Sequence, residues 1–595
     1  MKQLSYFLIL SVFFLSLNGQ VNRPLGVNLS YVADYATQLT FVNTFRQSRK
    51  WISCNADNTG PWDTQVSIPL RPDGYPIQIP YDNGVNPPQK LKSLVVWDLF
   101  GATPIGLYRL KSSGTGIIRL SNGASGIFHS PVDTLVAVNN GVIITIDSSL
   151  VSDPIRDIQF ILPDYVQTYT SQTFTPELLD FVQDFQVLRF MDFTRTNGSE
   201  VINWSDRTSP QYYSQAHQNG VAWEYVAQLA NETLKDIWIN IPHEANDAYI
   251  DSLAHLLQNT LNTELKVYVE FSNEVWNSGF SQHADCAMMA QNLGYTGQQW
   301  ERAWKFTAKR SADVFKIFES VFTNDARLVK IIPSQAANSW LSNQLVTFFN
   351  DPVYNPNAVA ADAIAIGPYF GNEIADRIIS NGNAALVTIP DIIDSLDQSQ
   401  AEAFQWILDN KTVATNHSLQ LIAYEGGQHL VGTGNNINDT ILTPKLIAAN
   451  QDSAMERLYC QYFNFWYQQV GNLFCHFSAV SKSSKYGSWG VQQNHQDTLN
   501  PKYLGLQNCV MSFNQSPTSV LSILKSELSE VYPNPSRGWV SFPLQPGSMM
   551  PYQVYNAQGG LMKSGNGEGV DISDLQVGVY LVKTPIKTFT VMRSE

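Results

Sequence analysis

The sequence has few charged residues and few cysteines. Charged side chains make up 15% of its 595 residues, against ~25% in typical soluble domains. The formal net charge of −14 disfavours nucleic acid as a partner, because phosphates attract a basic surface. The five cysteines lack the close spacing of a zinc site, so we expect at most two disulfides, buried apolar cysteines otherwise, and neither metal nor cofactor.

Long apolar runs are also scarce. The exception spans Leu4 to Leu17, after Lys2, and small and polar residues follow at Asn18, Gly19 and Gln20. This pattern predicts a signal peptide over residues 1–20. A membrane anchor is the alternative, but the run is shorter than the ~20 residues that a span requires and no stop-transfer charges follow. We therefore expect a secreted chain without a membrane span.

Motifs of several enzyme classes are missing. No Gly-rich phosphate turn follows the first predicted strand, which disfavours a doubly wound nucleotide-binding sheet. No Gly-x-Ser-x-Gly elbow or His-Glu-x-x-His helix is visible, which disfavours an esterase or a peptidase. Aromatic residues, in contrast, are plentiful, with 14 Trp, 26 Tyr and 30 Phe. Low charge with many aromatics suits a neutral ligand with apolar faces, such as a sugar ring, although aromatics also build cores.

Residues 21–52 and 163–513 alternate short apolar runs with longer helical stretches, such as Trp300 to Phe318 and Ala401 to Leu408. This alternation predicts an α/β fold, a (β/α)8 TIM barrel with loop insertions. The eight predicted strands are Leu25–Leu29, Val187–Phe190, Asp236–Ile241, Lys266–Phe271, Arg327–Pro333, Ala363–Ile366, Leu419–Ala423 and Phe474–Phe477.

Residues 53–162 differ in texture. Short alternating runs at Ser93–Leu99, Gly116–Leu120 and Gly141–Ile146 are separated by Gly, Pro, Asn and Asp. The pattern predicts a β-sandwich inserted after the first barrel strand. Such an insert binds carbohydrate or buttresses the barrel, and its position inside the barrel's chain favours the buttress.

The C-terminal region follows a polar linker, predicted at residues 514–526. Turn residues between alternating strands predict a small all-β domain over residues 527–595. Its motifs are Tyr532-Pro533-Asn534-Pro535, Tyr555-Asn556-Ala557-Gln558-Gly559 and Gly578-Val579-Tyr580. Together they resemble the C-terminal sorting domain of type IX secretion substrates; a generic adhesion-like domain is the alternative. The resemblance implies the secretion machinery as a partner, export through the periplasm and outer membrane, and in many cases removal of the tail.

Two predicted barrel strands deliver a glutamate. Ser272, Asn273 and Glu274 follow the fourth strand, and Glu425 follows the seventh. Barrel active sites lie just past the carboxyl ends of the strands, so both carboxyls are expected at one mouth. Glycoside hydrolysis needs such a pair: about 5–5.5 Å of separation gives retention, and roughly 6.5–9.5 Å admits a water and gives inversion. Repulsion between two close carboxylates raises one pKa and so provides the acid.

This ordered set is similar to that of clan A glycoside hydrolases. The resemblance covers the barrel strands, where Arg189, Asn273, Glu274, Tyr369 and Glu425 fall at matching strand ends. It implies that Glu274 is the general acid/base and Glu425 the nucleophile. It further implies that Asn273 binds the sugar 2-hydroxyl, that Tyr369 contacts the nucleophile, and that an aromatic ring after the eighth strand, Trp489, stacks on sugar.

Each candidate also has a structural explanation. Glu274 could interact with a helix dipole, Glu425 could form a loop salt bridge, and Arg189 is as readily a structural ion-pair partner. His243, at the third strand's mouth, is expected either to contact substrate or to support the site by hydrogen bonds. The remaining candidates are Asp192 as a second acid, Glu270 as a buried structural residue, and Trp276, Trp204 and Trp340 as sugar-subsite or packing residues.

The sequence thus predicts a secreted, monomeric, retaining glycoside hydrolase that cleaves β-linked polysaccharide, with endo action. The alternative function is a non-catalytic glycan-binding surface protein on a degenerate barrel. Cellulose, mannan, xylan and mixed-linkage glucans all offer planar apolar faces to aromatic side chains, so the residues do not select among these substrates.

Overall fold

The computed structural model describes residues 22–322, 325–514, 536–542, 549–556, 560–584 and 588–594. The chain divides into two compact units, Met1–Phe513 and Asn514–Glu595, which are considered separately. The predicted signal peptide, all of the linker beyond Asn514, the Tyr532–Pro535 motif and residues 557–559 lie outside the described residues. Within the described part of the chain, no helix combines the length and hydropathy needed to cross a membrane.

Eight parallel strands close into a barrel in the first unit, in the order β1-β14-β13-β12-β11-β10-β9-β8. All eight predicted strands are confirmed, with boundaries that differ by at most one residue at either end. The barrel strands are β1 (Leu25–Asn28), β8 (Val187–Arg189), β9 (Asp236–Ile241), β10 (Val267–Phe271), β11 (Leu328–Pro333), β12 (Ala363–Ile366), β13 (Gln420–Ala423) and β14 (Phe474–His476).

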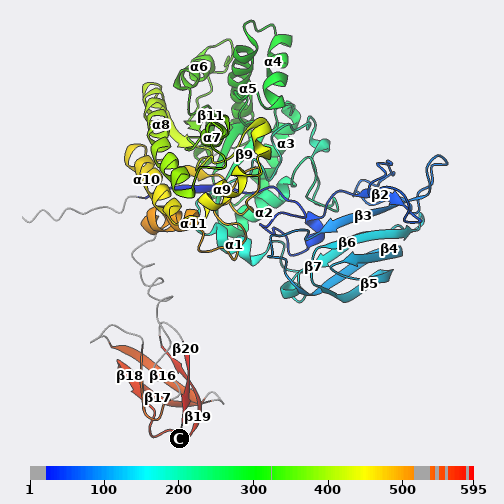
Figure 1. The fold of residues 1–595 in the computed structure, drawn as a ribbon, viewed down its shortest axis with the longest axis vertical. Coiled ribbons are helices and arrows are strands. Elements are labelled where there is room, and N and C mark those ends of the chain that lie inside the picture. The colour runs from blue at the N-terminus through cyan, green and yellow to red at the C-terminus, as the bar shows by residue number, and fades with distance from the viewer. Residues whose placement is uncertain are drawn as a thin grey trace, which may run out of the picture. The chain divides into compact units, whose positions relative to one another are not determined.

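Helices lie outside the barrel strands (Figure 1). Alternate residues of each strand face the two sides: Trp238 of β9 belongs to the cluster inside the barrel, whereas Ile237 and Ile239 pack in the outer cluster with the helices. The helices are α1 (Pro176–Val182), α2 (Trp223–Thr233), α3 (Asp247–Thr260), α4 (Ser281–Asn292), α5 (Gln299–Val321), α6 (Ser339–Asn350), α7 (Ile374–Ser380), α8 (Ile389–Asn416), α9 (Leu442–Asn450), α10 (Ala454–Gln469), α11 (Pro501–Leu506) and α12 (Ser512–Asn514). The two predicted helical stretches lie within α5 and α8.

Cys460 of α10 forms a disulfide with Cys509. The three other cysteines, Cys54, Cys286 and Cys475, are unpaired and buried.

The segment between β1 and β8 forms the predicted all-β insert, visible as a blade beside the barrel in Figure 1. Its strands are β2 (Ile52–Asn55), β3 (Gln89–Val95), β4 (Gly106–Asn122), β5 (Gly126–Val138), β6 (Val142–Ser149) and β7 (Arg156–Ile161). They form one hydrogen-bonded sheet, β2-β3-β6-β4-β5, with β7 also paired to β4. The first half of β4 pairs with β7, and the second half pairs with β6. One continuous sheet thus links these strands, whereas a sandwich would place its strands in two sheets.

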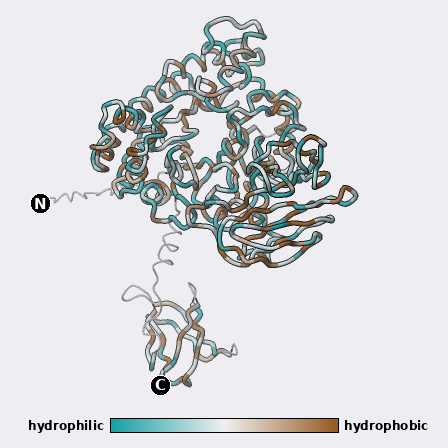
Figure 2. Tube along the Cα trace, turned by 45° about the vertical axis from the view of Figure 1, so that its right-hand side comes forward, coloured by the Kyte–Doolittle hydropathy of each residue, from teal (hydrophilic) through white to brown (hydrophobic). Residues whose placement is uncertain are grey.

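One face of this sheet is buried. More buried and exposed residues alternate along β5, although Ile127 and Leu135 on its exposed side are hydrophobic, and Figure 2 shows hydrophobic and hydrophilic stretches in this sheet. Its core includes Tyr108 and Phe160, whose rings stack 4.8 Å apart, together with Phe45 and Tyr75 from flanking loops. The insert therefore has a hydrophobic core distinct from that of the barrel.

The second unit is a small all-β domain, as predicted. Strands β15 (Trp539–Ser541) and β18 (Gly569–Asp571) form a two-stranded sheet. Strands β17 (Leu561–Gly567), β16 (Met550–Asn556), β19 (Gly578–Lys583) and β20 (Thr588–Arg593) form a four-stranded sheet in that order. Both contribute to one core that contains Val540, Val554, Val570 and Val582.

Candidate active site

Glu274 and Glu425 lie just past β10 and β13, at the same end of the barrel. The Tyr424 hydroxyl donates to Glu274 Oε1 at 3.0 Å, and Asn277 Nδ2 donates to Glu274 Oε2 at 3.0 Å. Glu425 is 6% exposed, whereas Glu274 is half-buried. The structure thus brings the two strand-end glutamates together at the carboxyl end of the barrel.

Glu274 depends on unusual backbone geometry, and Glu425 is followed by a closely packed glycine. Ser272 and Glu274 have left-handed φ angles of 57° and 44°, which cost of order 1–3 kcal/mol each in residues other than glycine. Hydrogen bonds from Ser272 N to Ile241 O at 2.8 Å and from Asn277 N to Glu274 O at 2.8 Å hold this turn. After Glu425, a Cβ at Gly426 would lie 2.6 Å from the Phe474 ring, so only glycine fits there.

Arg189, the last residue of β8, connects the catalytic candidates and is fully buried. Its Nη1 donates to Asn28 Oδ1 at 2.9 Å and to Glu425 Oε2 at 3.2 Å. Its Nη2 donates to Glu270 Oε2 and to Asn273 Oδ1, both at 2.9 Å. The guanidinium therefore fixes the orientation of Glu425 and of Asn273 together, and it compensates the two buried carboxylates.

Glu270 has the contacts of a buried counter-ion. Its side chain is fully buried, and Trp238 Nε1 donates to Oε2 at 2.7 Å. Burial raises the pKa of Glu270, and the Arg189 charge opposes this effect. Since Glu270 lies inside the strand, below the turn that carries Glu274, its part is to hold Arg189.

The two carboxyls affect each other's protonation. Burial and then the neighbouring Glu274 carboxyl raise the pKa of Glu425, while burial raises the pKa of Glu274. Two close carboxylates in such a site do not both ionise easily, so one of the pair holds its proton to a higher pH than a free glutamate does. The Arg189 charge, 3.2 Å from Glu425, acts in the opposite direction and lowers the pKa of Glu425.

Aromatic residues cluster beside Glu425. Burial and then the Glu425 carboxylate raise the pKa of Tyr369, which places the hydroxyl in the field of Glu425. The Trp489 ring lies 6.0 Å from the Tyr369 ring, 5.2 Å from His429 and 5.7 Å from Phe477, measured between centroids. Trp489 and Tyr369 are thus at the same mouth as the glutamates, although Trp489 lies well beyond β14.

Asn273 is fixed on two sides, by Arg189 and by a hydrogen bond from its Nδ2 to Asn197 Oδ1 at 3.0 Å. His243 is buried, and its Nε2 pairs with Asp285 Oδ2 at 3.1 Å. Trp276 packs partly buried against the barrel cluster, and within the described residues its indole N–H has no partner. The contacts of His243 are those of a supporting residue, and substrate contact stays a prediction for all three.

Trp204 and Trp340 lie in helix packing. Trp204 packs against Tyr249 at 5.3 Å between centroids, and Trp340 of α6 packs against Trp300 and Trp304 of α5.

Other residues near the pair were not identified from the sequence. Tyr424, which adjoins Glu425, is one of them. Tyr31 and Arg195 follow the neighbouring strands β1 and β8, and the Arg195 guanidinium lies 5.1 Å from the centre of the Tyr31 ring. Asp192 lies in the same turn, since Arg195 N donates to Asp192 O at 3.1 Å, and burial raises the Asp192 pKa to about 6. Asp192 was named from the sequence as a second acid, and its position after a barrel strand was the signal that could also have pointed to Arg195.

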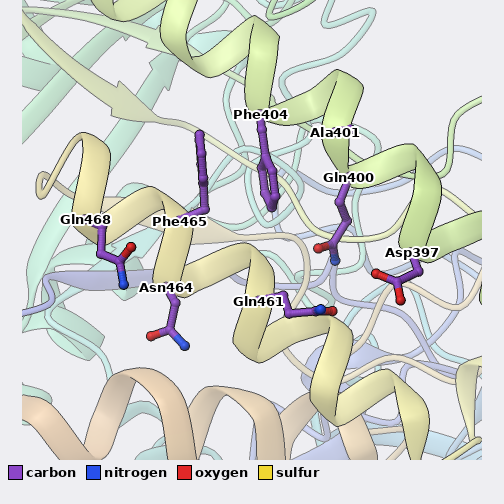
Figure 3. Close-up of a pocket in the computed structure, with 8 residues that line it drawn as sticks. All are labelled: Asp397, Gln400, Ala401, Phe404, Gln461, Asn464, Phe465 and Gln468. Atoms are coloured by element: carbon purple, nitrogen blue, oxygen red, sulfur yellow. The ribbon is translucent and has the colours of Figure 1, made fainter.

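A groove on the outside of the barrel is separate from this site. It has a volume of about 430 Å³ between α8 and α10. Figure 3 shows Phe404 of α8 and Phe465 of α10 side by side in its lining, and their rings stack 4.0 Å apart. Within the described residues, no group of three or more His, Cys, Asp or Glu side chains is arranged to hold a metal ion.

Comparisons with known proteins identify the tail. Residues 530–593 match the family described as the secretion system C-terminal sorting domain, and this tail indicates export from the cell by type IX secretion. No curated protein matches the chain.

Solved structures with similarity include glycoside hydrolases. Xylanase 10C from Cellvibrio japonicus, in complex with xylopentaose, is 10% identical, with 78% of this chain and 97% of that chain covered and a TM-score of 0.33. The GH51 arabinofuranosidase from Xanthomonas axonopodis pv. citri is 10% identical, with 71% and 88% covered and a TM-score of 0.34. A modular endo-β-1,4-mannanase from Cellulomonas fimi is 10% identical, with 71% and 88% covered and a TM-score of 0.29.

Proposed function

We propose that the chain is an exported retaining glycoside hydrolase that cleaves β-linked polysaccharide through Glu274 and Glu425. The observation that carries this proposal is the meeting of the two strand-end glutamates at one barrel mouth, where Tyr424, the residue before Glu425, donates to Glu274 at 3.0 Å. Retention needs carboxyls about 5–5.5 Å apart, whereas inversion needs roughly 6.5–9.5 Å to hold a water. The Tyr424–Glu274 contact and the effect of Glu274 on the pKa of Glu425 support a close pair, and so the retaining mechanism.

In the first step Glu425 attacks the anomeric carbon while Glu274 donates its proton to the departing glycosidic oxygen. Arg189 at 3.2 Å favours the ionised form of Glu425, and the Tyr369 hydroxyl lies in the field of this carboxylate. The product is a glycosyl ester on Glu425 and a free reducing-end sugar.

In the second step Glu274, now ionised, takes a proton from a water that attacks the same carbon. Glu425 leaves as a carboxylate, and the sugar regains its original anomeric configuration. Tyr424 and Asn277, which each donate to Glu274 at 3.0 Å, stabilise its ionised form at this stage. No step requires a metal or a cofactor.

Substrate contacts follow from the same geometry. Asn273, held between Arg189 and Asn197, presents its amide to the sugar 2-hydroxyl. Trp489 offers a half-buried ring for stacking on a sugar face. Tyr31 and Arg195 extend the surface beyond β1 and β8. An exported enzyme meets polymers, which supports endo action on chains rather than on small glycosides.

The test is a panel of polysaccharides, namely xylan, mannan, soluble cellulose and mixed-linkage glucan, with release of reducing ends as the readout. We expect the wild type to hydrolyse at least one polymer, and Glu274→Gln and Glu425→Gln each to lose at least about 10³-fold in rate. Glu402→Gln, an exposed position on α8, is the matched control and should keep full activity. Binding of a glycan without any release of reducing ends would instead support the non-catalytic alternative.

A further inference from the structure

The inserted sheet carries a pocket of its own, with a volume of about 390 Å³. Side chains from β2, β3, β4 and β6 line it, and the loop of residues 58–62 forms its wall. This volume lies within the range of roughly 300–1,000 Å³ of small-ligand sites. Lys90, Lys92, Arg119 and Trp62 dominate the lining, so the pocket combines cations with an aromatic ring.

Lys92 is the unusual member of this pocket. Its side chain is only 8% exposed, and Nζ lies 3.3 Å from the centre of the Trp62 ring. Within the described residues the Lys92 ammonium forms no hydrogen bond and no ion pair, although it has three protons to donate. The ammonium therefore has protons available to a ligand in the pocket, and burial of the side chain lowers the pKa of Lys92.

The other cations of the pocket are already paired. Lys90 Nζ contacts Asp147 Oδ1 at 3.3 Å and Asn58 Oδ1 at 2.6 Å, and Arg119 contacts Asp147 Oδ2 at 2.7 Å. Asp147 therefore pairs with both Lys90 and Arg119. The negative charge of the exposed Asp63 raises the pKa of Lys92 without an ion pair between the two within the described residues. The pocket keeps an excess of positive charge in a chain whose net charge is −14.

Trp62 supplies the second half of the recognition. Lys92 covers one face of the indole, yet the Trp62 side chain is 54% exposed. Exposed indole rings stack on the apolar faces of sugars, and neighbouring Asn55 and Thr59 offer polar groups for hydroxyls.

We propose that this pocket binds an acidic saccharide, one whose sugar units carry carboxylates. Its carboxylate accepts hydrogen bonds from Lys92, and its ring packs against Trp62. The site is distinct from the Glu274–Glu425 pair and does not depend on hydrolysis. It gives the insert a binding role that holds the chain on uronate-containing polysaccharide.

The experiment is calorimetric titration of the full chain with oligogalacturonate, oligomannuronate and glucuronate-bearing xylo-oligosaccharide, with cello-oligosaccharide as the neutral probe. We expect at least one oligouronate to bind more tightly than the neutral probe, and more weakly as salt rises. Lys92→Gln and Trp62→Ala should each weaken binding at least about tenfold, the effect of losing one charge-assisted contact. Lys92→Arg should retain most of the affinity.

Lys50→Gln, an exposed lysine outside the pocket, is the matched control and should bind as the wild type does. Thermal melting of each variant checks the fold. Because Trp62 is exposed, Trp62→Ala should leave the fold intact even if Lys92→Gln destabilises it. The proposal is overturned if no oligouronate binds, if the neutral probe or inorganic phosphate binds equally well, or if both pocket variants bind like the wild type.

Discussion

Arg189 Nη1 lies 3.2 Å from Glu425 Oε2, while Nη2 of the same guanidinium lies 2.9 Å from Glu270 Oε2. One buried cation thus serves a structural carboxylate and the proposed nucleophile. The charge that Glu270 anchors below the strand end is the charge that lowers the pKa of Glu425 against the effect of burial. Barrel stability and reactivity are coupled through this residue.

Replacing Arg189 tests that coupling. Arg189→Met leaves Glu270 buried without a counter-ion, and we expect a loss of about 3–5 kcal/mol in unfolding free energy. The double variant Arg189→Met with Glu270→Gln removes both charges and should recover much of that stability, yet stay inactive because Glu425 lacks its cation. Denaturant unfolding and hydrolysis assays on the three proteins measure both effects. Equal stability of the single and double variants would contradict this account of Glu270.

The two glutamates have different expected phenotypes on activated substrates. Aryl β-glycosides with acidic phenol leaving groups need little protonation, so Glu274→Gln should keep a much larger share of its rate on them than on polysaccharide. Glu425→Gln should be inactive on both, because no nucleophile is left. Rates on p-nitrophenyl and dinitrophenyl glycosides make the comparison. The reverse pattern would exchange the two roles.

Asp192 predicts a pH dependence of stability. Burial raises its pKa from 3.8 to about 6, so the folded state binds this proton more tightly than the unfolded state. Its ionisation therefore destabilises the fold above about pH 6, and this penalty disappears as pH falls toward 4. Asp192→Asn should raise the unfolding free energy by about 1–3 kcal/mol at pH 8 and by much less at pH 4. A gain independent of pH would exclude this cause.

The Cys460–Cys509 disulfide closes a loop of 49 residues and should stabilise the barrel by about 2–4 kcal/mol, because it restricts the unfolded chain. Reduction of the disulfide and the replacement of both cysteines by serine should lower the melting temperature to the same extent. Reducing agent should have no further effect on the double variant, which serves as the control. Unchanged melting on reduction of the wild type would show that the bond does not stabilise the fold.

The barrel was predictable from the sequence because each strand is a short buried apolar run, bounded by turn residues and followed by a helix. Glu274 and Glu425 were recognisable because each directly follows such a run. The contact between Tyr424 and Glu274 was not, since it joins side chains from β13 and β10, which are separated by other strands. Tyr31 and Arg195 likewise meet only once β1 and β8 pair to close the barrel.

The insert shows why strand lengths escaped prediction. The sequence predicts a short strand at Gly116–Leu120, but β4 runs from Gly106 to Asn122. A register shift between Ser112 and Gly116 absorbs Gly114, whose φ is 82°. A glycine within a strand resembles a turn in the sequence, and only the partner strand β5 continues the ladder past it.

The central claim is that Glu274 and Glu425 work as a retaining pair. It is tested most directly by proton NMR of the anomeric configuration of the first products released by the wild type from a polysaccharide that it cleaves. The account predicts that the newly formed reducing ends appear first in the β configuration of the cleaved linkage and then mutarotate. Initial appearance of the α anomer would contradict it.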